Sequence, residues 1–407
     1  MDALAAMPAT PPWAWWREAG LLERYLGDLL QGELAALRPG RAPAAPPSAN
    51  DDLVEALGLD SLEWLALSAA LGELAPAALQ GDRDPPRRWD AWLALVREGL
   101  ATGPSALTVR SSGSTGAPRR STHPLPELWQ EMQAMARVIG PRQRVVCLVR
   151  SHHIYGFLFG VLLPRVWGGV PVLHLPGEQL ARLPAQVRPG DLVVGYPEGW
   201  AALSRLVPQW PADVVGVTST APCPPATAQA AIDSGLTRLL QVYGSSETAG
   251  IGWRDQPDGA YRLHPFWRRD PVDPGTLWRR SPEGSESARR VPDALDFEDE
   301  QHFRPAGRLD GVVQVGGVNV QPAAVAEALR RHPGVAEAAV RPHAVAGGAL
   351  RLKAFVVPRH GASPALAQEL LDWAARQLAP AARPVHVRVG PALPTGAMGK
   401  AADWPLD

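Results

Sequence analysis

The sequence has little that would tie it to a membrane, a nucleic acid or an oxidising compartment. Its 407 residues contain no apolar run long enough to span a bilayer, because arginines, prolines and acidic residues interrupt every hydrophobic stretch. The formal net charge is −1, so neither nucleic acid nor an anionic membrane is an expected partner. The two cysteines, Cys147 and Cys223, match no metal-binding spacing, which favours a reducing environment. The N-terminal stretch lacks the basic start and apolar centre of a signal peptide. We therefore expect a cytoplasmic protein.

The first 103 residues are predicted to be mainly helical. Residues Trp16 to Arg38 carry apolar side chains at helical spacing, and a Pro/Ala-rich break follows them. The stretches DDLVEALGLDSLEWLALSAALGEL and RRWDAWLALVREGL then predict further helices with acidic starts. No strand is expected here.

From Ala106 onwards, short β-rich runs alternate with helical stretches. The runs include ALTVR, RVVCLVR, VPVLHL, DLVVGY, VVGVTS and RLLQVYG. This alternation predicts βα units and a mostly parallel sheet, hence an α/β fold. Residues 253–300 are polar and rich in proline, so loops or short hairpins are expected there. The final segment predicts a small α+β domain, with VVQVGGVNV as a strand pair joined by a glycine turn.

The segment SSGSTGAPRR, residues 111–120, directly follows the run ALTVR. Its glycines allow a tight turn in which backbone N–H groups converge on an anion, and its hydroxyl groups add donors. Arg119 adds a fixed positive charge that suits phosphate. The segment lacks the GK[ST] ending of a Walker A loop. Taken alone, it fits either a phosphate-binding loop or a plain Ser/Gly linker.

Four more motifs follow in order. YGSSE spans Tyr243 to Glu247, and Asp293 lies ten residues before Phe303, which lies five before the Arg308 of GRLDG. VQVGGVNVQP and the terminal PTGAMGK complete the set. With these motifs the chain resembles the adenylate-forming superfamily of acyl- and aryl-CoA synthetases, nonribosomal-peptide adenylation domains and luciferases. The resemblance covers about 295 residues. It departs from the family pattern at Arg119, where the family has lysine, and at Ser246, where it has threonine.

The resemblance implies an adenylate-forming fold with a truncated N-terminal part of the large domain. The expected divisions are a helical N-terminal region at 1–103, an AMP-binding large domain at 104–307, a hinge at 308–310 and a small mobile α+β domain at 311–407. Enzymes of this family attack the α-phosphate of ATP with a carboxylate, giving an acyl-adenylate and pyrophosphate. A thiol then takes the acyl group.

The resemblance also implies ATP and Mg²⁺ as cofactors, and it assigns the ATP-binding residues. These are Ser111, Ser112, Gly113, Ser114, Thr115, Gly116 and Arg119 at the phosphates, Ser219, Thr220, Ala221 and Pro222 at the adenine, Tyr243, Gly244, Ser245 and Ser246 in the second motif, and Asp293 at the ribose.

Three further residues receive catalytic roles from the resemblance. Glu247 is the expected Mg²⁺ ligand, a hard oxygen for a hard ion. Arg308 would reach the ribose or the α-phosphate, and Lys400 would bridge the acyl carboxylate and the α-phosphate. Taken singly, Glu247 or Asp293 would be an ordinary solvated carboxylate and Lys400 a surface lysine near the chain end. The ordered set of motifs favours the functional roles.

The C-terminal domain is expected to rotate between the two half-reactions. Asp310 falls at the hinge position of GRLDG, where an exposed polar residue can tolerate two backbone states. Gly316 and Gly317 would let a pantetheine arm pass close to the backbone. The same pair also predicts a simple hairpin turn, and both interpretations can hold together.

The stretch SHHIYGFLFGVLLP lies where the family builds its acyl pocket. His153 corresponds to the residue that closes the pocket over the substrate carboxylate, which adds it to the catalytic set, and Tyr155, Phe157 and Phe159 would supply apolar walls. Their spacing places them on one side of a strand or around a helix start. An aromatic wall suits a planar aryl acid, whose phenolic hydroxyl a histidine or tyrosine could bind. The alternative is ordinary packing of an amphipathic helix.

The short length of the chain indicates which members of the superfamily it resembles most. It is similar to the short 4-coumarate–CoA ligases associated with photoactive yellow protein, and also to the aryl-acid ligases of aryl-polyene and xanthomonadin-type pigment pathways. The predicted function is therefore ATP-dependent activation of an aryl acid, of the 4-coumarate or hydroxybenzoate type, with CoA as the acceptor. The alternatives are loading of an acyl carrier protein through its phosphopantetheine arm, and a non-catalytic relative that binds nucleotide.

The N-terminal region contains a second resemblance. LGLDSLEWLALSAALGE is similar to the phosphopantetheine site of acyl carrier proteins, with Ser61 in the modified position. Alternatively, Asp60 and Ser61 simply form the N-terminal cap of an amphipathic helix. We expect a carrier-like helix bundle that replaces the missing N-terminal subdomain.

Overall fold

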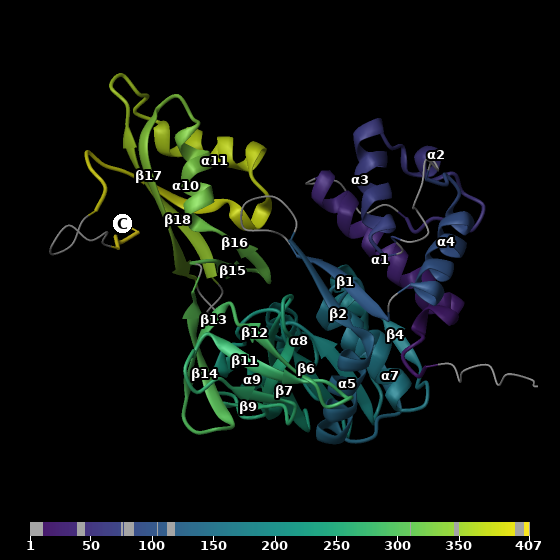
Figure 1. The fold of residues 1–407 in the computed structure, drawn as a ribbon. Coiled ribbons are helices and arrows are strands. Elements are labelled where there is room, and N and C mark those ends of the chain that lie inside the picture. The colour runs from purple at the N-terminus through teal and green to yellow at the C-terminus, as the bar shows by residue number, and fades with distance from the viewer. Residues whose placement is uncertain are drawn as a thin grey trace, which may run out of the picture.

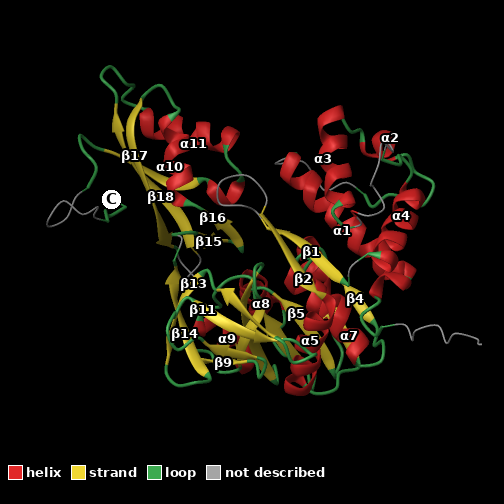
Figure 2. Cartoon of the chain, viewed as in Figure 1, coloured by secondary structure: helices red, strands yellow, loops and turns green. Residues whose placement is uncertain are grey.

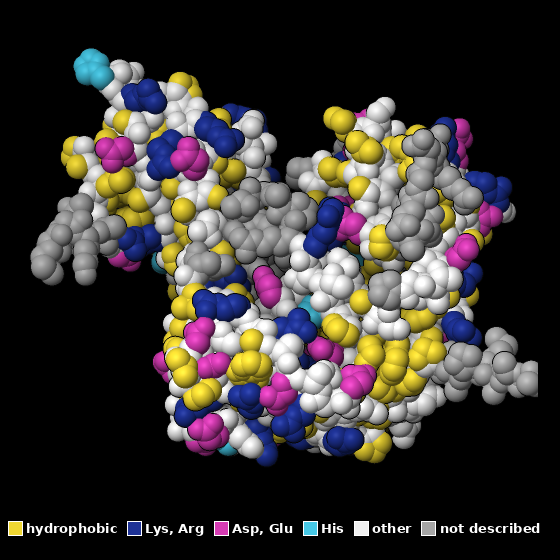
Figure 3. Space-filling model, viewed as in Figure 1, with side chains coloured by type: hydrophobic (Ala, Val, Ile, Leu, Met, Phe, Trp, Pro, Cys, Tyr) yellow, Lys and Arg dark blue, Asp and Glu magenta, His cyan; other side chains and the backbone are white. Residues whose placement is uncertain are grey.

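The computed structural model describes residues 11–38, 45–74, 76, 85–103, 105–111, 119–309, 311–345, 350–394 and 403–406. Figure 1 shows the N-terminal helices and the C-terminal domain above a large domain, each on its own side. In the space-filling view a notch separates these two upper parts (Figure 3). No helix in the described ranges is long and apolar enough to cross a membrane.

Two of the N-terminal helices, α2 and α3, begin at acidic caps, in agreement with the acidic start that the sequence predicts. Asp52 accepts hydrogen bonds from the Val54 and Glu55 N–H groups at the start of α2, and Gly58 ends that helix in the left-handed region. Asp60 and Glu63 form a reciprocal capping box at the start of α3. The region comprises a 3₁₀ turn η1 (Trp15–Arg17), α1 (Ala19–Leu37), α2 (Leu53–Leu57), α3 (Ser61–Gly72) and α4 (Trp89–Thr102).

The run ALTVR does not join the parallel sheet that the sequence predicts. It forms β1 (Ala106–Ser111), which pairs antiparallel with β2 (Arg119–Pro124). The segment SSGSTGAPRR therefore connects two strands of a hairpin. The partner strand RRSTHP is polar, so its hydrophobic pattern gives no strand signal.

The central sheet is mixed rather than mostly parallel. In the described part of the chain its strand order is β13-β14-β9-β8-β7-β6-β5-β3-β4. The half from β4 to β7 is parallel, and the half from β7 to β13 is antiparallel. The strands are β3 (Arg144–Cys147), β4 (Val172–His174), β5 (Asp191–Gly195), β6 (Val215–Thr218), β7 (Arg238–Ser245), β8 (Ala249–Arg254), β9 (Tyr261–Leu263), β13 (Asp293–Phe297) and β14 (His302–Arg308).

Helices cover both faces of the parallel half, which explains its nearly continuous apolar strands. On β5, for example, Leu192 and Val194 face one core while Val193 faces the other. Figure 2 shows the helices flanking the sheet. They are α5 (Leu125–Ile139), α6 (Ile154–Phe157), a π-helical segment η3 (Leu158–Leu162), α7 (Leu163–Val166), a 3₁₀ segment η4 (Gly177–Ala185), α8 (Pro197–Leu206) and α9 (Pro225–Asp233).

The N-terminal helices share one hydrophobic core with the large domain. Trp15, Tyr25 and Phe157 are almost fully buried, and the Trp15 ring lies 4.9 Å from Tyr25 and 5.3 Å from Phe157. The three rings join η1 and α1 to α6. The helical region is thus packed into the large domain.

Within residues 253–300 the structure has the short hairpins that the sequence predicts as one alternative. β10 (Trp267–Arg269), β11 (Thr276–Arg280) and β12 (Glu286–Arg290) form a small antiparallel sheet. Its buried side chains join those of β8, β9, β13 and β14 in a separate core.

The C-terminal part has the α+β character that the sequence predicts. β15 (Val313–Val315) and β16 (Val318–Val320) form a hairpin, and β17 (Val335–Ala344), β18 (Leu350–Pro358) and β19 (Pro384–Val389) form a sheet. α10 (Pro322–Arg330) and α11 (Leu366–Gln377), with the 3₁₀ turn η5 (Pro380–Ala382), pack against them around a core of their own.

Candidate active site

Part of the predicted site falls outside the described residues. These positions are Ser112, Gly113, Ser114, Thr115, Gly116, Asp310 and Lys400. Ser111 and Arg119 are described only as the backbone ends of β1 and β2, where they pair with each other. The hairpin therefore gives the place of the predicted phosphate loop.

Three predicted nucleotide-binding residues, which come from β7, β13 and β14, are in contact. Asp293 and Arg308 are paired across β13 and β14, with 3.7 Å between the Arg308 Nε and an Asp293 carboxylate oxygen. The Tyr243 hydroxyl, from β7, donates to the other carboxylate oxygen. Burial, reinforced by the Asp293 carboxylate, raises the pKa of Tyr243, so the phenol stays protonated and remains a donor. Residues 15 to 65 positions apart in the sequence thus form one cluster.

Glu247 lies in a tight turn between β7 and β8, which we call the Glu247 turn (residues 245–250). The Ser245 hydroxyl accepts from the Glu247 and Thr248 N–H groups at 3.2 and 3.3 Å. Gly244 must be a glycine here, because a Cβ would come 2.1 Å from the Ala249 carbonyl oxygen. The YGSSE sequence is therefore explained by a turn that presents the half-buried Glu247 side chain.

Side chains from β2, α5 and β10 hydrogen bond to the backbone of the Glu247 turn. His123, on β2, hydrogen bonds the Ser246 carbonyl through Nε2 at 2.7 Å. Both carboxylate oxygens of Glu131, on α5, lie 3.1 Å from the Gly250 N–H, and the Trp267 indole donates to the Gly250 carbonyl at 2.9 Å. Sequence reasoning missed these residues, because no motif contains them.

The predicted adenine-side segment follows β6. Ser219 donates to the Val242 carbonyl at 2.9 Å, which ties the segment to β7. Thr220 has a φ of 80°. A β-branched residue there is strained by roughly 1–3 kcal/mol.

The glycine turn of the C-terminal domain lies beside Thr220. Gly316 and Gly317 have φ values of 58° and 76° and connect β15 to β16 directly, as a two-residue hairpin turn requires. A Cβ on Gly317 would lie 3.4 Å from the Thr220 Oγ1. The hairpin alternative and contact with the site therefore hold together.

The predicted acyl-pocket aromatics lie on a helix, so the strand alternative is wrong. Tyr155 and Phe157 are in α6, and Phe159 follows in the π-helical segment η3. The Tyr155 hydroxyl lies 3.0 and 2.9 Å from the carbonyl oxygens of Gly195 and Val217, at the ends of β5 and β6. Phe157 contacts the N-terminal core, which is the packing that the alternative interpretation describes.

His153, the residue before α6, has an exposed side chain. Desolvation by the neighbouring protein atoms lowers the pKa of its imidazole, so the ring is neutral near pH 7. The neighbouring His152 ring lies 3.9 Å away.

A buried carboxylate on α1, which sequence reasoning missed, holds the segment that precedes α6. Asp28 accepts from both the backbone N–H and the hydroxyl of Ser151 at 2.6 Å. His174, at the end of β4, lies 3.3 Å from the same carboxylate. Burial opposes both charges, but the hydrogen bond between them lowers the pKa of Asp28 to about 2 and raises the pKa of His174 to about 9. The pair is separated by 146 residues, so no local pattern predicts it.

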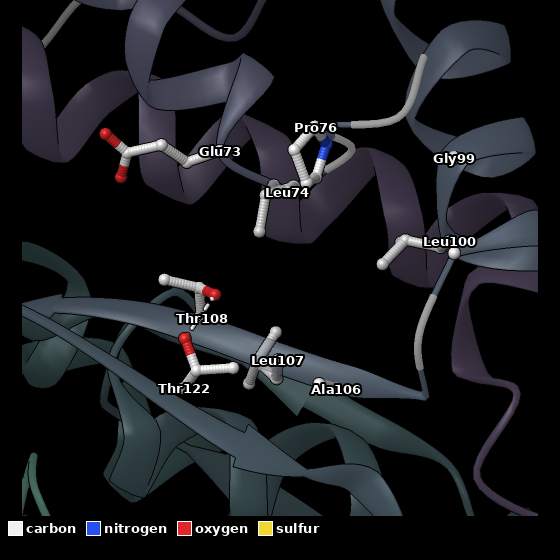
Figure 4. A pocket seen from close by; sticks show the side chains of 10 residues that line it. Glu73, Leu74, Pro76, Gly99, Leu100, Ala106, Leu107, Thr108 and Thr122 are labelled. Carbon is white, nitrogen blue, oxygen red and sulfur yellow. Dashed lines mark hydrogen bonds between the residues drawn. The ribbon is translucent and has the colours of Figure 1, made fainter. Parts of the chain in front are cut away.

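The N-terminal helices also contact the hairpin that carries the predicted phosphate loop. Arg110, on β1, forms ion pairs with Glu33 at 3.0 Å and with Glu73 at 3.3 Å, and Arg120 pairs with Glu73 from β2. A cavity of about 60 Å³ lies beside Glu73, above Thr108 and Thr122 (Figure 4). It can hold about two water molecules and is too small for a nucleotide or an aryl acid.

Glu247 is the only residue that the sequence assigned to a metal. The described residues contain no cluster of three or more side chains suited to holding a metal ion. A single carboxylate fits Mg²⁺ that is bound mainly by phosphates and water.

Ser61 is the first residue of α3 and is exposed. The Asp60 carboxylate accepts from the Leu62 and Glu63 N–H groups at 2.9 Å. The helix-cap interpretation of this motif is therefore confirmed, and modification of Ser61 stays a prediction.

Comparison with known proteins gives matches along the chain. Residues 324–400 match the family of AMP-binding enzyme C-terminal domains. A 4-coumarate–CoA ligase of Halorhodospira halophila is 38% identical over 389 residues, covering 93% of this chain and 97% of that protein. A 4-coumarate–CoA ligase of Rhodobacter capsulatus is 36% identical over 402 residues, covering 94% of this chain and 100% of that protein.

A solved structure also shares the fold. The amide bond synthetase McbA of Marinactinospora thermotolerans matches with a TM-score of 0.59 at 19% identity, over 93% of this chain and 92% of that chain. Both termini of the match lie close to the chain ends, so the likeness includes the N-terminal helices as well as the C-terminal domain.

Proposed function

Since this chain belongs to the 4-coumarate–CoA ligase family and is an AMP-forming acid–CoA ligase, we propose that it activates a hydroxylated aryl acid of the 4-coumarate type. ATP-dependent activation of an acid and formation of its CoA thioester are the reaction of the family, and the adenylate-forming fold is confirmed. The observation that carries the choice of acid is the 38% identity across 97% of a 4-coumarate–CoA ligase.

Adenylation concentrates negative charge on the phosphates, and the residues that we assign to the phosphates would stabilise this charge. The carboxylate attacks the α-phosphate and pyrophosphate leaves, so backbone donors and cations lower the barrier. We assign the β- and γ-phosphates to the loop between β1 and β2, with Arg119 as its cation. Glu247 would hold Mg²⁺, which neutralises phosphate charge when bound. The bracing by His123 and Glu131 keeps Glu247 aimed at that position.

The ribose is assigned to Asp293. Its carboxylate can accept from the ribose hydroxyls while Tyr243 and Arg308 hold it in place. The adenine is assigned to the segment 219–222, which begins beside β7. A preformed acceptor orients ATP before the acid attacks, which reduces the entropy lost in the transition state.

The acid is assigned to the exposed surface beside His153. The Tyr155 phenol has one proton and two carbonyl oxygens within hydrogen-bond distance, so this proton is already used within the protein. A phenolic hydroxyl on the acid would therefore find its donor or acceptor elsewhere. A neutral His153 can donate one hydrogen bond to the substrate carboxylate without neutralising the nucleophile.

Thioester formation is assigned to the arrangement in which Gly317 lies beside Thr220. We propose that rotation about residues 308–310, with Asp310 as the hinge, exchanges the Gly316–Gly317 turn for Lys400. A thiol arm approaching along the turn meets no side chain of Gly316 or Gly317, because neither residue has one.

The test is an acid panel with ATP and CoA, with mass spectrometry of small products and of the intact protein. Release of pyrophosphate and formation of an aryl-CoA with 4-coumarate support the proposal. Turnover only with aliphatic acids would reject the aryl assignment, and no turnover with any acid would favour a non-catalytic relative. A mass increase of the protein itself would instead indicate a phosphopantetheine arm on Ser61 and transfer to a carrier protein.

A further inference from the structure

The chain contains only two lysines, Lys353 and Lys400, although Lys and Arg together number 40. Lys400 has a role in the proposed function, and Lys353 has none. Where arginine occupies almost every basic position, a buried lysine marks a place that a compact ammonium fits and a broad guanidinium does not. The surroundings of Lys353 therefore bear on what it does.

Lys353 lies on β18 and is only 4% exposed. Its ammonium donates to the backbone carbonyl of Trp404 and forms a 2.9 Å ion pair with Asp403. A buried ammonium is costly unless it is paired and hydrogen bonded. Both of these partners belong to the segment 403–406, at the end of the chain.

The Trp404 side chain adds an apolar anchor to the same contact. It is 4% exposed, and its ring packs edge-on against Phe355 with 5.7 Å between centroids. The Lys353 ammonium lies 5.2 Å from the Trp404 ring centroid, and Arg388 donates to the Pro405 carbonyl at 3.4 Å. We call Lys353, Phe355, Asp403 and Trp404 the tail clasp. Figure 1 shows the C-terminus lying beside β17 and β18.

The tail clasp grips the chain just after the residue assigned to adenylation. Asp403 follows Lys400 by three residues, a length that spans at most about 10 Å. Chain connectivity therefore keeps Lys400 close to the tail clasp. Less entropy is then lost when the Lys400 ammonium is positioned at the substrate than if Lys400 were on a free chain end.

We propose that Lys353 is a positioning residue for adenylation, and that it acts by holding the segment that bears Lys400; the proposal rests on the proposed function. If Lys353 only stabilised the C-terminal domain, its loss would have a different effect. The C-terminal domain also supplies the Gly316–Gly317 turn for thioester formation, so general damage to this domain impairs both half-reactions. Loss of positioning impairs adenylation alone.

The experiment measures the two half-reactions separately in the full chain. Adenylation is followed as pyrophosphate release from ATP and 4-coumarate without CoA, and thioester formation as aryl-CoA produced from presynthesised aryl-adenylate. Lys353→Met removes the grip without leaving a buried charge. We expect its adenylation kcat to fall about 10- to 100-fold, with the KM for ATP and the thioester half-reaction unchanged.

Two further variants test the apolar anchor, and a third serves as control. Trp404→Ala should reproduce the selective loss, and Trp404→Phe, which keeps an aromatic ring against Phe355, should restore most of the rate. Glu327→Gln breaks an exposed ion pair with Arg330 in the same domain and should leave both half-reactions intact.

Three results would overturn the proposal. Wild-type adenylation by Lys353→Met would show that the tail clasp does not position Lys400. Equal loss of both half-reactions would show that the clasp only supports the domain. Absence of pyrophosphate release by the wild-type protein with any acid would reject the proposed function itself, and this inference with it.

Discussion

Glu131 offers a test of the bracing beneath the Glu247 turn, because its substitution by glutamine should change how stability depends on pH. The side chain is 1% exposed, and burial raises its pKa to about 8, although the Arg279 charge and the Gly250 N–H act in the opposite direction. The unfolded chain should titrate near the ordinary value of 4.5. Between these values the folded protein binds a proton that the unfolded chain has lost.

The sign and size of the effect follow from this difference. Because the native state binds more protons, stability falls as pH rises from the unfolded pKa to the folded one, by about 1.4 kcal/mol per pH unit. Glu131→Gln cannot titrate, so this contribution disappears. The variant should lose stability more slowly than the wild type as pH rises, whatever constant offset the substitution adds.

The assay is thermal unfolding of both proteins from about pH 5 to pH 8, with the difference in Tm plotted against pH. The wild-type Tm should fall by roughly 1.5–2 °C more per pH unit than that of the variant, because the unfolding entropy of a 407-residue chain is large. Met132→Leu, a volume-conserving change in the same buried helix, should follow the wild-type slope. Parallel curves for wild type and Glu131→Gln would refute the reasoning, since they would mean that Glu131 stays ionised in the folded protein.

Two further predictions concern the braces and the C-terminal domain. The pair of Asp28 and His174 should stabilise the protein fully above pH 3.8 and below pH 6.5, and this stabilisation should be lost as pH rises through about 9. The Tm gap between wild type and His174→Gln should therefore close in alkaline solution, and a gap that widens there would contradict the assignment. Gly317→Ala places a Cβ at a φ of 76° beside Thr220, at a cost of about 1–2 kcal/mol, so thioester formation should slow while adenylation is spared. Equal loss in both half-reactions would reject the role given to the glycine turn.

Local patterns predicted much of the fold. Helical spacing placed α1, α3 and α4, and the glycine pair placed the hairpin of β15 and β16. β1 was assigned to the wrong sheet, because its pairing depends on the polar segment Arg119–Pro124, whose composition gives no strand signal. The aromatics at 155, 157 and 159 were compatible with either periodicity, and tertiary packing decides for the helix.

Residues of the candidate site were predictable from the sequence only where they belong to a motif. The Tyr243, Asp293 and Arg308 cluster was expected from motif order, and the structure brings these residues together. Contacts such as that between Asp28 and Ser151 join positions 123 residues apart, so they depend on the packed fold and leave no local trace. The grip of Lys353 on Trp404 is of the same kind.

The central claim is that this enzyme joins a hydroxylated aryl acid to CoA through an aryl-adenylate. The most direct measurement incubates the protein with ATP, Mg²⁺, CoA and an equimolar mixture of 4-coumarate, hydroxybenzoate and aliphatic acids, and identifies the thioesters by mass spectrometry. We predict 4-coumaroyl-CoA as the main product, with AMP and pyrophosphate formed in equal amounts. An aliphatic acyl-CoA as the main product, or ADP in place of AMP, would contradict it.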